Sequence, residues 1–302
     1  MHSRNRMNAV RKMVVVLLAG LFLLGASSCN GGPPPKDDKI ATWPKDKVIA
    51  ELNANNSQIT SIFTYNAVTI TNERFPSGQS GKAYIVYKRP DKLLLIFQVA
   101  GQTVFLMKTD GENVDIVDFE NNKGQTATVA NLEKFNALAG FQPDFLTAAM
   151  GLEIIEPSAA TVETGEHQYN LTIGEPNGKT RVLHVTHSPF QLDRQDVYTG
   201  EPGASDLEMT VEYKQYHDVE TTDTKKTVRI PIHMVIDVPG NNFKLEMQVT
   251  SNSIRDIRVN DERRVDRMIG SSWRYSWEPG MLVKKLNDNG EWVPYDPEGD
   301  SH

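Results

Sequence analysis

Cys29 is the only cysteine in this chain of 302 residues, so its thiol is the one reactive sulfur that the sequence offers. A single cysteine excludes an intramolecular disulfide. It lies a few residues after an apolar run, Met13 to Leu24, which predicts export from the cytoplasm. An exported chain with one cysteine leaves the thiol free, pairs it with another chain or modifies it. The position directly after the apolar run favours modification.

The residues before Cys29 form the three parts of a signal peptide. Basic residues up to Lys12 precede the apolar run, and the small residues Gly25 to Ser28 follow it. A run of about a dozen residues is too short to span a membrane, which takes about 20. The site resembles the bacterial lipobox, in which a diacylated cysteine becomes the mature N-terminus, although Ala26 stands where Leu is commonest. An ordinary signal peptide cleaved near Ala26 is the alternative.

The lipobox resemblance implies a membrane as the first partner, through Cys29. Two acyl chains are enough for stable anchoring. Asn30 stands where an Asp would signal retention in the inner membrane, so the outer membrane (periplasmic face) is favoured over the outer leaflet of the inner membrane. We therefore predict a signal peptide over residues 1–28. Residues 29–44 follow as an acylated, Gly- and Pro-rich tether.

Charge and motifs restrict the possible functions of the remaining chain. Loss of four basic side chains with residues 1–28 changes the net charge from −7 to −11, which argues against nucleic acid as a partner. His184 and His187 lie three apart on a predicted strand and therefore point to opposite faces, a poor arrangement for metal. There is no P-loop, Gly-x-Ser-x-Gly or His-Glu-x-x-His motif. We expect a non-enzymatic protein without cofactor or metal.

The elements that position any site are mainly strands. Residues 45–56 carry apolar residues at helical spacing, and alternating strand patterns extend from about Ile59 to Val259, with a helical insertion at 130–150. We predict a mainly β fold, an unclosed antiparallel half-barrel of about a dozen strands covered by a few helices. This domain spans residues 45–260. A C-terminal extension, 261–302, is expected to pack partly on it and to end in disorder.

Residues 81–93 carry a resemblance to a known family. They read as a strand, a Lys88-Arg89-Pro90 turn and a second strand, and the Asp110-Gly111 turn follows about twenty residues later. This pattern is similar to the LolA/LolB superfamily of outer-membrane lipoprotein carriers. The helix at 45–56 and the insertion at 130–150 stand where that family has its first helix and its lid helices. The resemblance implies a concave apolar face that holds acyl chains, with Arg89 hydrogen-bonded to a closed lid.

On this basis we expect a lipid or an acyl chain as ligand, in sorting of lipids or lipoproteins to the outer membrane. The candidate ligand-binding and lid residues are Arg89, Tyr84, Tyr87, Leu94, Ile96, Leu106, Phe141, Phe145, Leu146 and Met150. Two plainer interpretations stay open: Arg89 as a surface residue that begins a turn, and the insertion as a helix that completes the core. The alternative function is a structural or protein-interaction module of the cell envelope with a filled core. Arginines between Arg255 and Arg267 form a basic cluster, either a solvated face or a contact for an anionic partner.

Overall fold

The computed structural model describes residues 42–73, 75–135, 150–175, 178–202, 207–272, 277 and 280–296. Residues Ile40–His302 form one compact unit, separate from Met1–Lys39, and the following description concerns that unit. Cys29 lies outside the described residues, as does most of the predicted tether. No helix in the described ranges is long and apolar enough to cross a membrane.

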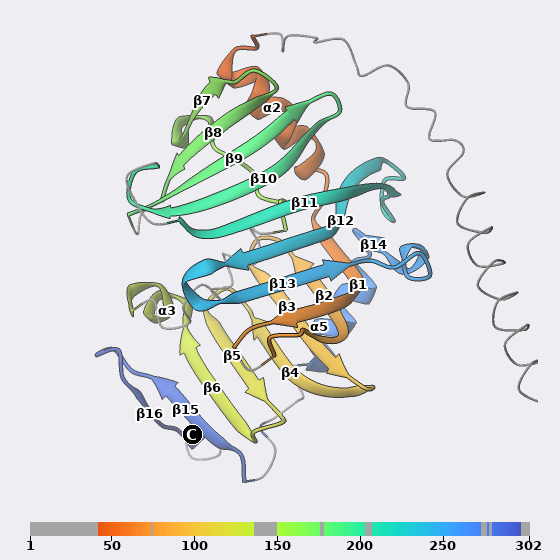
Figure 1. The fold of residues 1–302 in the computed structure, drawn as a ribbon. Helices are drawn as coiled ribbons and strands as arrows, with labels where there is room; N and C mark the ends of the chain where they lie inside the picture. Colours follow the sequence, from red (N-terminus) through yellow and green to blue (C-terminus); the bar gives the residue numbers. More distant parts are fainter. Residues whose placement is uncertain are drawn as a thin grey trace, which may run out of the picture. The chain divides into compact units, whose positions relative to one another are not determined.

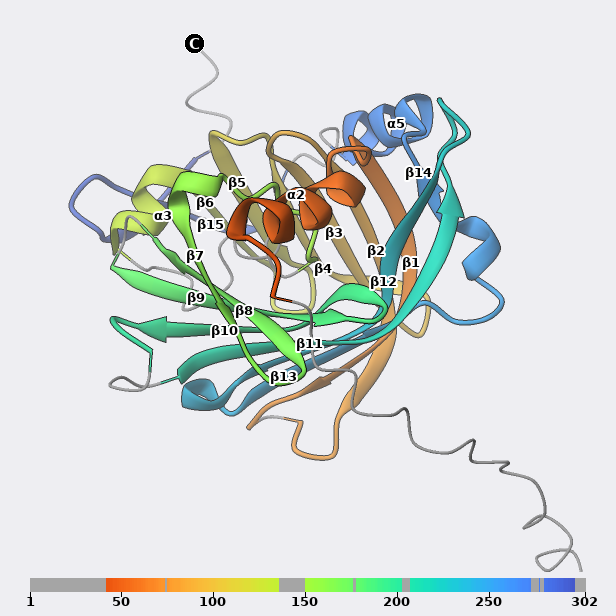
Figure 2. The same ribbon diagram turned by 90° about the horizontal axis from the view of Figure 1, so that it is seen from above.

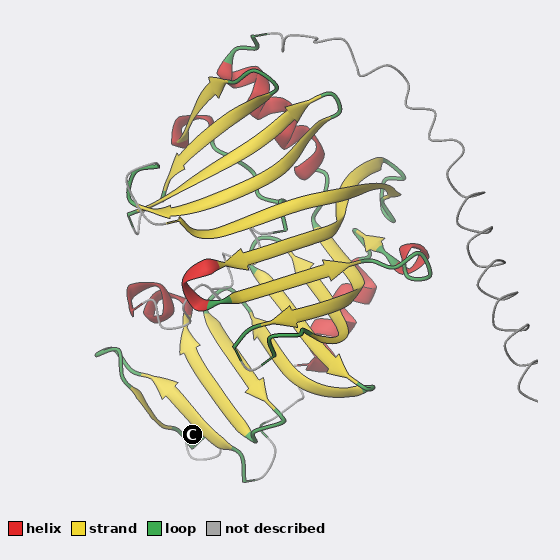
Figure 3. Ribbon diagram, in the orientation of Figure 1, coloured by secondary structure: helices red, strands yellow, loops and turns green. Residues whose placement is uncertain are grey.

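The unit is built on a single open sheet, shown in Figures 1 and 3. Two antiparallel meanders make up most of it, and they meet where the first strand pairs with the thirteenth. The predicted mainly β, unclosed architecture is therefore confirmed. The first meander contains β1 (Ser61–Thr71), β2 (Gln79–Lys88), β3 (Lys92–Val99), β4 (Gln102–Thr109), β5 (Asn113–Asp118) and β6 (Lys123–Thr128). The second contains β7 (Ala160–Thr164), β8 (Gln168–Gly174), β9 (Lys179–His187), β10 (Phe190–Thr199), β11 (Leu207–Glu220), β12 (Thr227–Val238) and β13 (Phe243–Gln248).

Residues beyond 260 belong to the same sheet. Strand β15 (Leu282–Leu286) pairs parallel with β6, and β16 (Trp292–Pro294) pairs antiparallel with β15. The helix α5 (Glu262–Ser272) comes before them. The described residues thus contribute sixteen strands, with β16 and β7 at the two edges of the sheet and the short β14 paired with β1.

Helix α2 (Lys45–Asn56) has the predicted bounds and lies inside the curve of the sheet (Figure 2). It begins after Pro44, whose fixed φ suits a helix start and whose carbonyl accepts from Lys47 N at 3.0 Å. Val48, Ile49 and Leu52 are buried, as expected for one apolar stripe of a helix. We call the side of the sheet that α2 covers the inner face and the opposite side the outer face.

Two apolar cores lie on the two faces of the sheet, because successive side chains of a strand alternate. The large core on the inner face includes α2 and residues from both meanders. The small core on the outer face lies under α5, whose Val265 and Ile269 pack with Phe63 and Val86. Lys88 Nζ adds ion pairs from β2 to Glu262 and Asp266 of α5, at 2.8 and 2.6 Å.

The structure differs from the sequence-based prediction at several elements. Residues 254–259 form the 3-10 turn η3 (Ile254–Asp256) and the two-residue β14 (Arg258–Val259) instead of one strand. The predicted helix of the insertion coincides at its start with α3 (Val129–Phe135), and residues 136–149 lie outside the described residues. Strands β6, β7, β15 and β16 and helix α5 were not predicted.

Candidate functional site

Residues 150–156 cross the inner face as an extended segment, which we call the strap. Its Met150, Leu152 and Ile155 are buried in the large core, Leu152 with only 2% of its surface exposed. Gly151 has a φ of +67°, and a Cβ there would lie 3.2 Å from the ring of Tyr213 and 3.3 Å from Leu192. Glycine is therefore required, because the backbone approaches β10 and β11 closely in a left-handed conformation. The strap follows directly on residues 136–149 of the predicted insertion.

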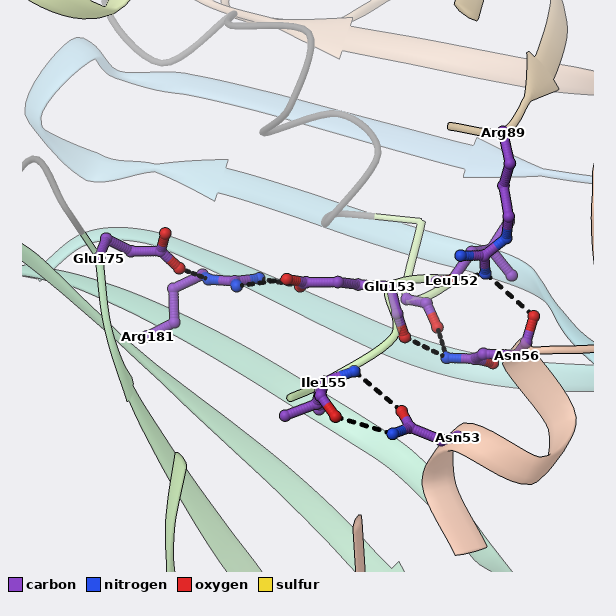
Figure 4. Close-up of polar contacts among 9 residues, drawn as sticks. Asn53, Asn56, Arg89, Leu152, Glu153, Ile155, Glu175 and Arg181 are labelled. Carbon is purple, nitrogen blue, oxygen red and sulfur yellow. Dashed lines mark hydrogen bonds and ion pairs between the residues drawn. The ribbon is translucent and has the colours of Figure 1, made fainter. Parts of the chain in front are cut away.

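The C-terminal half of α2 binds the strap through two asparagines (Figure 4). Asn53 donates from Nδ2 to Ile155 O at 2.8 Å and accepts from Ile155 N at 2.9 Å, so its side chain pairs with the strap as a neighbouring strand would. Asn56, which is buried, donates to the carbonyl oxygens of Gly151 and Glu153 at 3.0 and 2.9 Å. These contacts supply the hydrogen bonds that a buried, non-helical backbone requires.

Arg89, which belongs to the first meander, binds both the strap and the C-terminal end of α2. It stands in the β2–β3 turn, where its backbone N donates to Thr60 O at 2.8 Å. Its Nε donates to Ile59 O at 2.6 Å, and its Nη2 donates both to Asn56 O at 2.9 Å and to Leu152 O. Arg89 is only partly exposed. We call this set of bonds the Arg89 latch. Arg89 does begin a turn, and its side chain also binds backbone carbonyl groups of α2 and the strap.

A second arginine binds the strap through a side chain. Arg181 of β9 is buried and makes a two-point contact with the carboxylate of Glu153, with Nη2 at 2.9 Å from Oε1. Its Nε also donates to Glu175. Burial alone would lower the pKa of Arg181, but the hydrogen bonds and charges of Glu153 and Glu175 raise it above its ordinary value. The guanidinium therefore stays charged, and such forked contacts are the strong ones.

The structure separates the predicted ligand-binding residues. Arg89 and Met150 contact or belong to the strap, and Tyr87 faces the same inner core. Tyr84 lies three residues from Tyr87 and points to the opposite face. The described members found in the outer core under α5 are Tyr84, Leu94, Ile96 and Leu106. The remaining members, Phe141, Phe145 and Leu146, lie outside the described residues. The predicted set therefore does not line one surface.

Several residues of the site were missed by sequence reasoning although a signal was present. Arg181 occupies an inward position of β9, in phase with Leu183 and Val185, and a charge in an apolar row indicates a buried partner. Asn53 and Asn56 lie three apart and share a helix face. Only the fold shows that this face meets the strap.

Two histidines and one arginine of the basic cluster contact side chains of the protein itself. His184 Nε2 lies 3.0 Å from Asp196 Oδ2 on the outer face, whereas His187 packs against Trp43 with ring centroids 5.0 Å apart. Arg264 lies over the ring of Phe63 at 4.4 Å. Within the described ranges, no three His, Cys, Asp or Glu residues are grouped so that they could hold a metal ion.

No family model matches the sequence, and no curated protein matches it either. Solved structures do resemble the fold. A putative outer membrane lipoprotein-sorting protein domain from Vibrio parahaemolyticus has 11% identity and a TM-score of 0.51, covering 75% of this chain and 99% of its own. A LolA superfamily protein from Nitrosomonas europaea has 9% identity and a TM-score of 0.47, over 73% of this chain and 95% of its own. A DUF1329 family protein from Desulfovibrio piger has 10% identity and a TM-score of 0.47, over 72% and 92%.

These identities bear on the fold alone. The half-barrel expected from the residues around Lys88-Arg89-Pro90 is confirmed, and this chain has the fold of the outer membrane lipoprotein-sorting protein domain from Vibrio parahaemolyticus.

Proposed function

We propose that the protein is a membrane-anchored lipoprotein of the cell envelope that holds an acyl chain of a lipid or lipoprotein against the inner face, with the strap as the movable cover. The observation that carries the proposal is the Arg89 latch. Arg89 binds the strap through the carbonyl of Leu152 and α2 through that of Asn56, so one side chain joins the two covering segments. Such bonds exchange for water when the strap leaves, and re-form when it returns.

The free energies of apolar burial allow a ligand to replace the strap. Burial of a large apolar side chain is worth about 1.5–3 kcal/mol, and the strap buries Met150, Leu152 and Ile155. A buried acyl chain contributes about 0.8 kcal/mol for each methylene group. About ten methylene groups therefore offset the three side chains, and the chains of membrane lipids are longer than that. A ligand of this class can displace the strap without the loss of the rest of the core.

The test uses the chain from residue 30 onward, which retains the whole compact unit of residues 40–302 and lacks the lipidation site. Displacement of the apolar fluorescent probe N-phenyl-1-naphthylamine by phospholipid measures binding. Arg89→Leu frees the strap and is expected to change probe affinity at least several-fold. Arg263→Leu, at an exposed position of α5, is the matched control and should behave as the wild type. A wild-type protein that neither binds the probe nor carries lipid contradicts the proposal.

The anchor at Cys29 has its own test. Intact mass analysis of the protein from the membrane fraction should give a chain that begins at Cys29 and carries a diacylglyceryl group. Since there is no other cysteine, Cys29→Ser removes every thiol-linked modification. The variant should leave the membrane fraction. An unmodified Cys29, or a Cys29→Ser chain still bound to membranes, would contradict lipidation.

The second candidate is an envelope module with a permanently filled core. It is favoured by the depth of the strap, since Leu152 and Ile155 pack as ordinary core residues. This candidate predicts no probe binding and a strap whose amide hydrogen exchange is unchanged by added lipid. The same samples therefore decide between the two functions.

A further inference from the structure

A row of inward side chains crosses the second meander from strand to strand. Register pairs join Leu171 to Leu183, Leu183 to Gln195 and Gln195 to Val211. The row continues from Val211 to Ile236 on β12. Residues paired in this way share a face of the sheet. The four hydrophobic members all belong to the large inner core, so Gln195 is the only polar side chain among these five positions.

Gln195 is enclosed and has an unused hydrogen-bond donor. Only 1% of its surface is exposed, and its Nε2 has no hydrogen-bond partner among the described residues. The neighbouring Asp196 shows the contrast: on the outer face it accepts from Arg194 at 2.7 Å and from Thr210 at 2.9 Å. A buried donor without a partner destabilises a fold, so its presence in an apolar row points to a partner that binds there.

The strap lies next to Gln195. A Cβ at Gly151 would lie 3.3 Å from Leu192 and 3.2 Å from Tyr213, which are the adjacent inward residues along β10 and β11 from Gln195 and Val211. Arg181, which binds Glu153 of the strap, faces the same side and is the diagonal neighbour of Gln195, because it pairs with Val197. A strap that leaves the inner face therefore uncovers the surroundings of Gln195.

We infer that the carboxamide of Gln195 is the polar anchor of the ligand site and donates from Nε2 to the carbonyl oxygen of an acyl group. The inference rests on the proposed function and names its ligand class: a chain that ends in an ester or carboxyl carbonyl, as in a glycerolipid or a fatty acid. Apolar sites orient their ligands with a small number of such groups. The methylene groups of the ligand lie along the apolar row, and the carbonyl meets Nε2.

The experiment measures displacement of N-phenyl-1-naphthylamine from the chain from residue 30 onward by methyl laurate, lauric acid and tridecane. These probes share an apolar chain and differ in the carbonyl. Gln195→Met keeps the length of the side chain and removes the donor. It should weaken binding of the ester and the acid about fivefold, as expected for one hydrogen bond, and leave tridecane within about twofold. An effect on the acid alone or the ester alone identifies which source of the carbonyl is bound.

Stability gives an independent readout. Without ligand, Gln195→Met should raise the midpoint of thermal unfolding by about 2 °C or more, because an unpaired buried amide is removed. Gln248→Met, at an exposed position of β13, is the matched control and should change neither quantity. Gln195→Leu repeats the test with a second apolar side chain. Equal effects on all three probes, or none, overturn the anchor while the proposed function stands. A wild type that binds no probe overturns both.

Discussion

Arg89 and Leu152 are 63 residues apart in the sequence, yet the guanidinium of Arg89 donates to the carbonyl oxygen of Leu152. The same nitrogen donates to Asn56 O at the end of α2, 2.9 Å away. One side chain in a hairpin turn of the first meander thus binds both α2 and the strap, the two segments that cover the second meander. A long-range bond to backbone carbonyls fixes where the strap lies without restricting its side chains.

Removal of the Arg89 latch should loosen the strap. Arg89→Leu leaves the carbonyls of Ile59, Asn56 and Leu152 without this donor, and we expect a loss of about 2–4 kcal/mol in the free energy of unfolding. Arg89→Lys should lose about half as much, since a single ammonium cannot reproduce the fork. Urea unfolding measures both, and hydrogen exchange should rise first at residues 150–156. Unchanged exchange there would show that Arg89 does not hold the strap.

Asn53 should contribute to stability beyond its helix propensity. Asn53→Ala removes both bonds to the backbone of Ile155, and the free energy of unfolding should fall by about 1–3 kcal/mol. Glu51→Ala, at an exposed position of the same helix, is the control and is expected to stay within about 0.5 kcal/mol. Equal effects of the two substitutions would mean that the Asn53 pairing adds nothing to stability.

Packing of the C-terminal region on the outer face can be tested at Gly124 of β6. A Cβ there would lie 2.4 Å from the ring of Trp277, so Gly124→Ala forces the indole away. Overpacking of this kind costs about 1–3 kcal/mol. Gly270→Ala in α5 meets no atom within 4 Å and should be neutral or stabilising. Thermal unfolding reports the outcome, and a Gly124→Ala protein as stable as the wild type would contradict the packing.

Acid should weaken the outer face at Asp196. Burial alone would raise the pKa of Asp196, but hydrogen bonds from His184, Arg194 and Thr210 outweigh it, and the pKa is below its ordinary value. The carboxylate therefore contributes stability above the unfolded pKa of about 3.9, and this contribution is lost as the pH falls through the lower folded pKa. Asp196→Asn should destabilise the protein by about 1–3 kcal/mol at pH 5, and the difference from the wild type should shrink by pH 3. A difference that stays constant would exclude this role.

The parts of the fold that could be predicted are those with strong local patterns. Val48, Ile49 and Leu52 define α2, and runs of strand-forming residues separated by turn residues define β1 to β5 of the first meander. Strand β6 reads Lys-Gly-Gln-Thr-Ala-Thr and β15 reads Leu-Val-Lys-Lys-Leu, and neither has enough alternation to be recognised alone. These strands form because neighbouring strands offer open hydrogen bonds.

Helix α5 was missed although its signals were present. Val265, Met268 and Ile269 have helical spacing, and Asp261 caps the start by accepting from Arg264 N at 3.2 Å. The site was harder to predict. Arg89 was predicted through a resemblance. The alternation of β2 places Tyr84 and Tyr87 on opposite faces, so these two tyrosines cannot line the same surface. The partners of Arg89 are backbone carbonyl groups. Every residue has one, so the sequence does not indicate which of them accepts the hydrogen bond.

The most direct measurement is native mass spectrometry of the chain from residue 30 onward, purified from the bacterium that produces it. We expect a chain with one acyl lipid bound, and delipidation should lower the hydrogen exchange of residues 150–156 as the strap returns to the inner face. A chain that carries no lipid, takes up none when lipid is added and keeps the same exchange at residues 150–156 would contradict it.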